Sequence, residues 1–340
     1  MTEKRIPSLD GLRAISITLV ILSHLVKWHH IKLDMPGAYG TLGVKMFFVL
    51  SGFLITSLLL KEQADKGTIS LRRFYVRRAF RILPAALVYL IVATLLFWRQ
   101  MRWMHVAAAL FYIANMDSSL PWVLGHLWSL SIEEQFYLIW PLAIKTWFRY
   151  RIPVLLAVFG FTPIFHAILY ALGVKNGLVG SLPVFADQLA IGCLLAILAP
   201  RLPKISKPFA VAMLLAIALT PLYPATSPSR TLFMLFVLRP LVAVSLAGVL
   251  LHAIQVPYSF LNWRPITWIG QISYSLYLWQ QVFCSNPRLH LGYSLVIPAV
   301  ACACLSYYFV EKPLLRLRET LNRTISSPNQ AELSSQPMAA

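Results

Sequence analysis

The sequence predicts an all-α integral membrane protein, a bundle of about ten transmembrane helices with both termini in the cytoplasm. Of the 340 residues, 58% are hydrophobic and only 12% are charged, whereas soluble domains carry about 25% charged residues. The mean hydropathy is +0.68. The apolar residues also gather in runs of about 20, the number that spans a ~30 Å hydrocarbon core as a helix. We therefore expect a multi-pass protein of the cell inner (plasma) membrane, with the lipid bilayer as its first partner.

Ten apolar runs are long enough to cross a bilayer. In chain order they cover residues 9–28, 41–60, 79–98, 131–148, 152–172, 184–200, 208–222, 232–253, 267–284 and 291–310. The run 104–116 is too short to span, and Arg102 and Asp117 flank it, so we expect an interfacial or re-entrant segment. Together the runs form one membrane domain over residues 1–320. The polar, unpatterned stretch 321–340 predicts a disordered cytoplasmic tail.

Lysine and arginine are distributed unevenly between the two sides of the predicted bundle. With a cytoplasmic N-terminus, 20 of the 30 lie on the inner side and 9 on the outer side, which is the asymmetry expected of cytoplasmic loops. An even number of runs then returns the C-terminus to the cytoplasm. Because the net charge of +18 lies mostly in short loops, we expect no nucleic-acid partner. The four cysteines include no Cys-x-x-Cys pair, so neither a disulfide framework nor a metal site is expected.

Charged and titratable side chains interrupt the first run, Ser8 to Lys27. Asp10, Arg13 and His24 lie within it, although a charge at a bilayer centre costs roughly 2.5–3.5 kcal/mol. Arg13 and His24 are eleven residues apart, so they share one helix face at a separation of about 16 Å. This stripe predicts a polar path through the membrane, although snorkelling of Arg13 and a hydrogen bond from His24 to a neighbouring helix also explain it. No small-x-small cleavage site follows, so we expect a retained helix rather than a signal peptide.

The block H-L-W-S-L-S-I-E-E-Q-F-Y, residues 126–137, overlaps the beginning of the fourth run. In the predicted topology Glu133 and Glu134 lie at its outer end, at a depth similar to that of His24. A carboxylate beside a histidine holds its tautomer and stabilises the imidazolium, so one of the two glutamates is a candidate catalytic residue. The alternative is structural: Ser131 would be the N-cap, and the two acids would suit the helix dipole.

Two further blocks hold candidate residues. Arg78 and Arg81 lie three residues apart at the inner end of the third run, and such a pair suits phosphate. Arginines beside a span are also routine topology anchors, and the sequence by itself favours that explanation. In the second run, Gly52 allows a close helix contact and Ser51 can donate a hydrogen bond across it.

Two more acids lie in or at the end of predicted spans. Asp187 lies in the sixth run and Glu311 at the inner end of the tenth, and an intramembrane acid is a functional candidate by default. Glu311 beside Lys312 is also explained as an interfacial ion pair. The sequence holds no Walker A, H-E-x-x-H or G-x-S-x-G motif, so the phosphate-loop, metalloprotease and nucleophile-elbow classes are not indicated.

Six blocks occur in an order that resembles a known family. They are S-L-D-G-L-R-A-I-S…S-H, F-F-V-L-S-G-F, R-R-A-F-R-I-L-P, H-L-W-S-L-S-I-E-E-Q-F-Y, S-Y-S-L-Y-L-W-Q and Y-F-V-E-K-P. Together they resemble the membrane-bound acyltransferase family 3, which includes bacterial O-acetyltransferases of lipopolysaccharide, exopolysaccharide and Nod factor, and macrolide acyltransferases. The resemblance covers about residues 5–318. Asp187 marks a departure, because similar sequences often carry an arginine two residues earlier, where this chain has Phe185.

The resemblance implies roles for the candidate residues. Motif residues of the family correspond to Arg13, His24, Arg78, Arg81, Trp128, Ser129, Leu130, Glu133, Glu134, Gln135, Phe136, Tyr137, Glu311 and Pro313. In the implied mechanism the arginines hold the phosphates of a cytoplasmic acyl-CoA donor, such as acetyl-CoA, and no cofactor is bound permanently. The histidine acts as general base towards an acceptor hydroxyl, with Glu133 and Glu134 as catalytic partners, or first carries the acyl group itself. Further candidates without an assigned role are Asp10, Ser51, His126, Ser129, Asp187 and Glu311.

The implied reaction is O-acylation, most simply O-acetylation, of a carbohydrate hydroxyl on a lipid-linked or cell-surface glycan of the bacterial envelope. Glycan-assembly proteins are candidate partners. The chain ends soon after the tenth run, without the extracytoplasmic esterase-like domain that some members carry, so we expect the membrane domain or a separate protein to complete the transfer. A macrolide-type acceptor is one alternative. A transporter of acyl donors or glycan precursors is another, because ten spans with intramembrane charge also describe a carrier, although no inverted repeat is visible.

Overall fold

The computed structural model describes residues 6–29, 38–174, 180–223, 226–286, 289 and 292–318. Across these residues every regular element is a helix, which confirms the predicted all-α class. Within the same ranges, seven helices are long and apolar enough to cross a membrane. They are α1 (Pro7–His29), α2 (Ala38–Lys66), α3 (Leu71–Leu96), α6 (Arg151–Ala171), α7 (Leu182–Leu198), the continuous helix of α9 (Pro228–Phe233), η8 (Met234–Leu238) and α10 (Arg239–Gln255), and the continuous helix of η9 (Gly292–Leu295), α12 (Val296–Ser306) and η10 (Tyr307–Glu311).

The other three expected spans also form helices. α8 (Lys207–Leu219) has 13 residues, fewer than the ~20 that a spanning helix needs. α5 (Leu127–Thr146) and α11 (Arg264–Cys284) are long enough but carry several polar side chains. The count of about ten spans therefore stays a prediction. The segment expected at the interface contains α4 (Trp103–Leu110) and η2 (Ala114–Met116), and the predicted tail 321–340 lies outside the described residues.

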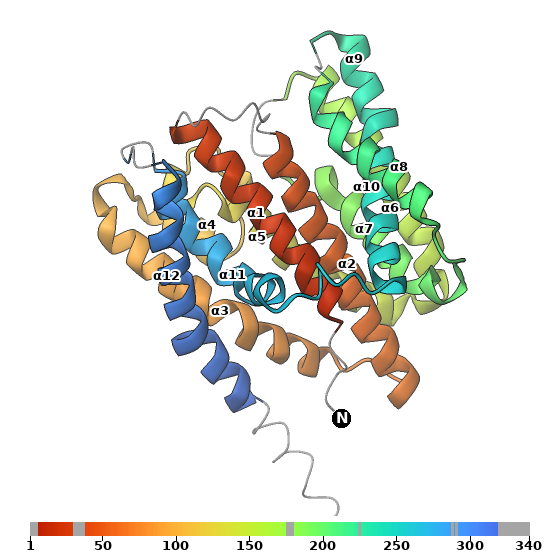
Figure 1. Cartoon of the computed structure of the whole chain (residues 1–340), viewed down its shortest axis with the longest axis horizontal. Coiled ribbons are helices and arrows are strands. Elements are labelled where there is room, and N and C mark those ends of the chain that lie inside the picture. The colour runs from red at the N-terminus through yellow and green to blue at the C-terminus, as the bar shows by residue number, and fades with distance from the viewer. Residues whose placement is uncertain are drawn as a thin grey trace, which may run out of the picture.

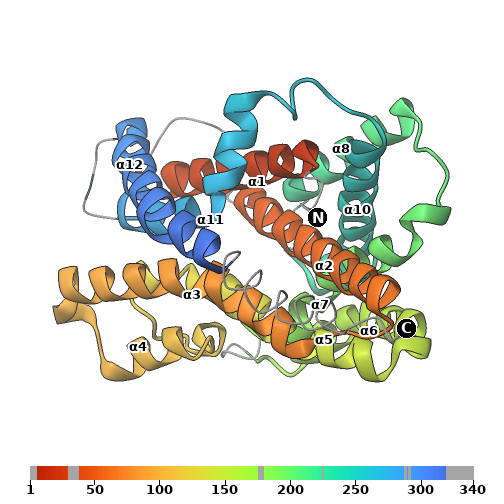
Figure 2. The same ribbon diagram turned by 90° about the horizontal axis from the view of Figure 1, so that it is seen from below.

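Helices α1 and α2 lie at the centre of the bundle (Figure 1). α2 packs most extensively against α7 and α1, while α1 packs against α11, which in turn packs against α12. α6 packs on α7, and α8 on α10. Seen from below, α3 and α4 lie on one side of α2, and α8 and α10 lie on the opposite side (Figure 2). The central helices therefore connect two halves of the molecule.

Two glycines bring α2 and α7 into backbone contact. A Cβ on Gly52 would lie 2.2 Å from the Leu189 carbonyl oxygen, and a Cβ on Gly192 would lie 2.2 Å from the Val49 carbonyl oxygen. Each glycine thus faces the backbone of the other helix, and only a residue without a side chain fits at such a crossing. The close contact predicted at Gly52 is confirmed, and Gly192 is its counterpart on α7.

Two helices begin earlier in the sequence than expected, and this changes the depth of their polar residues. α3 begins at Leu71 rather than near 79, so Arg78 and Arg81 lie inside the helix and not at its mouth. α5 begins at Leu127 rather than at 131. The expected N-cap role of Ser131 is wrong: its hydroxyl donates to the Leu127 carbonyl within the helix, at 2.9 Å.

Two basic residues that the topology count assigned to the outer side lie inside helices. Lys45 belongs to α2, and Arg239 is the first residue of α10. Both helices are among those long enough to span, so neither residue is a loop charge. Arg78 and Arg81 of the inner count lie inside a helix in the same way, so leaving out all four residues leaves the inner excess of basic residues unchanged.

Candidate active site

A cavity of about 100 Å³ lies inside the bundle, lined by residues of α1, α2, α3, α5, α11 and η10. It gathers residues that are remote from one another in the sequence. The predicted site residues that line it are Arg13, Ser51, Arg78, Arg81, Ser129, Glu133 and Glu311. The lining therefore holds three guanidinium groups and two carboxyl groups, and the cavity is polar although most of the surrounding helices are apolar.

The three arginines approach the cavity from two helices. Arg13 of α1 forms an ion pair with Asp10 one turn earlier, with Nη1 3.6 Å from Oδ1. Arg78 of α3 lies over the ring of Tyr137, 3.8 Å from its centroid. Arg81, one turn further along α3, lies within electrostatic reach of Arg13, Arg78 and Glu311. Arg78 and Arg81 thus both line the cavity, Arg78 half-buried and Arg81 exposed, so phosphate binding stays a prediction beside the topology-anchor explanation that the sequence favoured.

Glu133 is held by a hydroxyl cluster between α2 and α5. Ser51 donates a short hydrogen bond to its Oε1. The hydroxyl of Tyr137 lies 2.9 Å from Ser51 Oγ and 3.1 Å from Glu133 Oε1. Because Tyr137 also contacts Arg78, the carboxylate, the two hydroxyls and the guanidinium form one polar group on the cavity wall. Of the two adjacent glutamates, Glu133 lines the cavity and Glu134 does not.

Glu134 lies beside this group. Its Oε1 is buried without a hydrogen-bond partner within the described part of the chain, and it lies within electrostatic reach of Arg78 and Glu133. A buried polar atom without a partner is uncommon in proteins. Glu133 is therefore the glutamate that lines the cavity. Glu134 stays a candidate catalytic residue because of its position beside this group.

Glu311 reaches the cavity from the end of a π-helical turn, η10. It is buried and accepts a short hydrogen bond from Ser275 of α11. Lys312, its neighbour in the chain, instead lies over the ring of Tyr308, with Nζ 5.0 Å from the centroid. The interfacial Glu311–Lys312 pair considered from the sequence is therefore not the contact that these residues make.

His24 does not line the cavity. Its Nδ1 lies 2.8 Å from Oε1 of Gln280 on α11, and Gln280 is one helical turn beyond Tyr277, which does line the cavity. The groups that act on His24 are Gln280, Lys27 and His126, and neither Glu133 nor Glu134 is among them.

The N-cap of α5, His126, is a neighbour of His24. His126 is buried and lies within electrostatic reach of His24. Its ring packs against those of Tyr89 and Tyr277, with centroids 5.2 and 5.4 Å apart. The Tyr277 hydroxyl donates to the His126 carbonyl at 2.9 Å and forms a short hydrogen bond with Ser129. Tyr277 and Ser129, which both line the cavity, are thus bonded to each other and to the backbone of His126.

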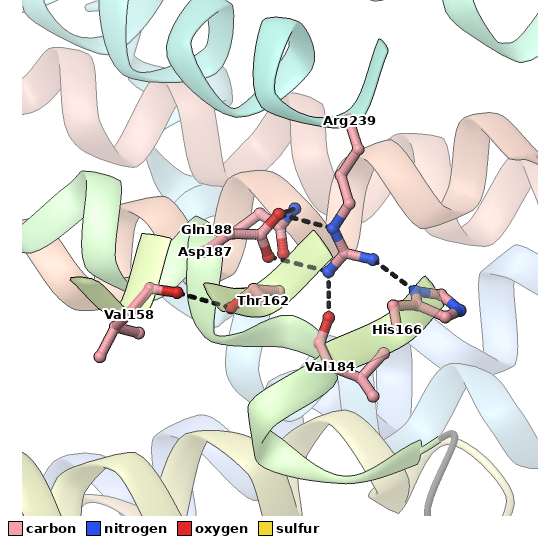
Figure 3. A network of polar contacts seen from close by, with 7 residues as sticks. All are labelled: Val158, Thr162, His166, Val184, Asp187, Gln188 and Arg239. Carbon is pink, nitrogen blue, oxygen red and sulfur yellow. Dashed lines mark hydrogen bonds and ion pairs between the residues drawn. The ribbon is translucent and has the colours of Figure 1, made fainter. Parts of the chain in front are cut away.

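Asp187 belongs to a second buried network (Figure 3), and none of the residues labelled there lines the cavity. Its carboxylate accepts two hydrogen bonds from Arg239 of α10, at 2.6 and 2.8 Å. Arg239 also donates to Nδ1 of His166 at 3.0 Å and to the Val184 carbonyl. Because a guanidinium only donates, Nδ1 of His166 is the acceptor.

Sequence reasoning missed Arg239 and underrated His166. The arginine that similar sequences carry at the position of Phe185 is absent, but Arg239 reaches the same place from another helix, with Cζ 5.9 Å from the Phe185 ring. It follows the π-helical turn η8 directly, and an isolated π turn often marks a functional or strained position. The only signal in the sequence was the R-P pair inside an apolar run.

Comparison with known proteins identifies the chain at the family level. Residues 6–309 match the family model described as an acyltransferase domain, in its type 3 form. The chain belongs to the acyltransferase 3 family. This confirms the resemblance drawn from the six sequence blocks, and the match covers nearly all of the described helices.

Two relatives of this acyltransferase 3 chain align over 92% of its length. The putative peptidoglycan O-acetyltransferase YrhL of Bacillus subtilis (strain 168) is 32% identical, and 55% of that protein is covered. The peptidoglycan O-acetyltransferase OatA of Listeria monocytogenes serovar 1/2a is 31% identical, with 56% covered. A putative O-acetyltransferase of Staphylococcus aureus (strain COL) is 46% identical over 160 residues, 42% of this chain and 25% of that protein. The chain thus spans about half the length of these two curated relatives, YrhL and OatA. No solved structure is similar at a significant level.

Proposed function

We propose that this protein is a membrane O-acyltransferase that moves an acyl group, in the simplest case acetyl, from cytoplasmic acyl-CoA to a hydroxyl of a carbohydrate. The observation that carries the proposal is the cavity, where three arginines meet the Ser51–Glu133–Tyr137 group. The family membership supports an acyltransferase, and the names of the relatives support acetyl transfer to a cell-wall glycan. Peptidoglycan or a related envelope glycan is therefore the acceptor class we propose.

The donor is proposed from the charge and size of the cavity. Guanidinium groups bind phosphate by paired hydrogen bonds, and Arg13, Arg78 and Arg81 lie together in the lining. A water-sized probe occupies about 10–15 Å³, so a cavity of about 100 Å³ has room for the acetyl-thioester end of the donor rather than for a whole coenzyme. We place the nucleotide at the inner mouth, with the thioester pointing into the bundle.

The chemistry requires a base near the acceptor hydroxyl, and His24 is the proposed base. The acceptor oxygen attacks the thioester carbonyl carbon while its proton passes to His24. A C–O bond forms and the C–S bond breaks. The coenzyme thiolate then receives the proton, so that the histidine returns to its neutral form. His24 does not line the cavity, and its partner Gln280 lies one turn beyond the lining residue Tyr277, so in this proposal the Tyr277 side chain moves for donor and base to meet.

The acceptor approaches from the outer side or laterally from the bilayer in this proposal. An envelope glycan lies outside the inner membrane, and His24 lies in the outer part of α1 in the predicted topology. The transferase would thus use a donor from one side and an acceptor from the other. Glycan-assembly proteins of the inner membrane are the proposed partners.

A histidine substitution tests the proposed function. His24→Gln keeps a hydrogen-bonding group but cannot take the proton, so acetyl transfer in membranes should fall by about 10²-fold or more. His252→Gln is the matched control: His252 is also a buried helical histidine, and it bonds Tyr258 at 2.6 Å and the Ile205 carbonyl at 3.0 Å. The control should keep most of the activity.

The outcomes separate the two functional classes. An acyltransferase in detergent releases free coenzyme thiol from acetyl-CoA in the presence of acceptor, and His24→Gln abolishes the release. A carrier would equilibrate acetyl-CoA across a vesicle membrane without cleaving the thioester. If His24→Gln accumulates normally and keeps more than about a tenth of the activity, a loss below that expected for a general base, another residue carries the chemistry.

A further inference from the structure

A chain of hydrogen bonds runs from a backbone carbonyl to the ring of His24. Gln281 Nε2 lies 2.5 Å from the Trp122 carbonyl oxygen. Gln280 Nε2 lies 3.5 Å from Gln281 Oε1 and 3.3 Å from the Tyr277 carbonyl oxygen. Gln280 Oε1 in turn lies 2.8 Å from His24 Nδ1. Both glutamines are buried, with 0% and 6% of their surface exposed.

The hydrogen bonds of this series can run in only one donor-to-acceptor direction. A backbone carbonyl can only accept, so the Trp122 carbonyl requires the amide NH₂ of Gln281, which leaves Gln281 Oε1 as an acceptor. Gln280 then donates its NH₂ to that oxygen and to the Tyr277 carbonyl. Its own Oε1 is left for His24, and an amide oxygen also only accepts. His24 must therefore carry its proton on Nδ1.

We propose that Gln280 and Gln281 are positioning residues that hold His24 in the Nδ1–H tautomer, so that Nε2 is the nitrogen that takes the proton in acyl transfer. This inference rests on the proposed function for the catalytic step, but the tautomer itself does not. A neutral imidazole alternates between two tautomers, and only the one with a free lone pair at Nε2 presents a base on that side of the ring. The series of hydrogen bonds from the Trp122 carbonyl to His24 excludes the Nε2–H tautomer.

The neutral amide also explains how the base is recycled. The charged or titratable groups within electrostatic reach of His24 are Lys27 on its own helix and His126, the N-cap of α5. None of the described carboxylates joins them, so no fixed negative charge retains the imidazolium after proton transfer. A glutamine orients the ring as a carboxylate would, but it leaves the histidinium free to return its proton to the thiolate.

Nitrogen NMR tests the tautomer directly. We would label the full-length protein with ¹⁵N-histidine in detergent and identify His24 by its missing signals in His24→Gln. Wild-type protein should show the protonated-nitrogen shift at Nδ1 and the unprotonated shift at Nε2. Gln280→Leu should mix the two tautomers, whereas Gln255→Leu, which removes two other glutamine–backbone hydrogen bonds, should change nothing at His24. A wild-type His24 protonated at Nε2 would overturn the inference.

Kinetics test the consequence for catalysis. Gln280→Leu should lower kcat for acetyl transfer by about 10²-fold, the lower end of general-base assistance, with KM for acetyl-CoA nearly unchanged. Gln280→Glu keeps an acceptor for Nδ1–H, so it should retain more activity than Gln280→Leu. Its added negative charge favours the imidazolium, so the acid limb of its pH–rate profile should move to higher pH.

A purely structural role for Gln280 predicts equal losses for Leu and Glu and no movement of the profile, and that result would refute the positioning role. Full kcat in Gln280→Leu would do the same. If His24→Gln is active while NMR still finds the Nδ1–H tautomer, then the proposed base is wrong and the hydrogen-bond chain is correctly described. The failures of the two proposals are therefore distinguishable.

Discussion

Glu133 shows at the scale of one residue how burial decides the role of a charge. Its carboxylate accepts from Ser51 and Tyr137 and lies within electrostatic reach of Arg13. An ionised carboxylate inside a membrane protein is stable only with such partners. The group that it organises lines the cavity, whereas His24 bonds Gln280 instead.

At the same scale, the proposed donor contact can be tested on α3. Arg81→Lys keeps the charge but loses the planar fork, so we expect weaker acyl-CoA binding wherever the contact is bidentate. Binding is measured on purified protein in detergent. Arg72→Lys is the matched control, because Arg72 is exposed on the same helix and does not line the cavity. Unchanged donor affinity in an Arg78→Ala/Arg81→Ala double variant would exclude the pair from donor binding.

The Asp187–Arg239 pair gives a prediction about stability. Asp187→Asn leaves a buried guanidinium without its counter-charge, which typically costs about 3–5 kcal/mol. We expect a clearly lower thermal unfolding midpoint in detergent. Replacing both partners, as in Asp187→Leu/Arg239→Met, should recover most of the loss, because a buried pair and an apolar pair are often similar in stability. Equal damage in the single and double variants would show that the pair acts through more than charge compensation.

At the scale of elements, small residues and π turns decide which side chains meet. Gly52 and Gly192 let α2 and α7 touch through their backbones, and this contact places Ser51 opposite α5. The turns η8 and η10 each lead to a buried charged residue, Arg239 after the first and Glu311 within the second. An extra residue in a turn rotates the remainder of the helix about its axis, so the two charges point into the bundle.

The glycine crossing can be tested with a matched pair of substitutions. Gly192→Ala puts a methyl group against the Val49 carbonyl, so α2 and α7 must separate, and we expect a loss of about 1–3 kcal/mol. Gly160→Ala on α6 meets nothing within 4 Å and should be neutral or stabilising by up to ~1 kcal/mol. Thermal unfolding in detergent measures both. A neutral Gly192→Ala would mean that the helices do not pack as closely as described.

At the scale of the whole molecule, the bundle turns exposed apolar surface towards lipid. Leu95, Leu156 and Ile297 are 70%, 55% and 73% exposed, and each lies on a helix long enough to span. In water such a surface would be unfavourable, whereas in a bilayer it is solvated by acyl chains. The polar interior and apolar exterior are consistent with a multi-pass membrane protein.

The orientation of the molecule is a prediction of its own. The inner excess of lysine and arginine predicts that both termini are cytoplasmic. Reporter fusions after residue 320 and within residues 173–183 should report inside and outside respectively. The reverse pattern would place the arginines on the outer side and remove the basis for a cytoplasmic acyl-CoA donor.

The sequence alone determined the class of the protein, the approximate helix positions, and all of the charged residues that line the cavity. These depend on local quantities: hydropathy over 20 residues, helical spacing, and motifs short enough to read along one chain. The tertiary structure alone decided which side chains contact one another. Whether Arg78 faces lipid headgroups or Tyr137, and whether a glutamate or Gln280 holds His24, depends on where helices begin and how closely glycines let them approach. These contacts join residues more than 50 positions apart, as in the Asp187–Arg239 and His24–Gln280 pairs, and no local pattern records them.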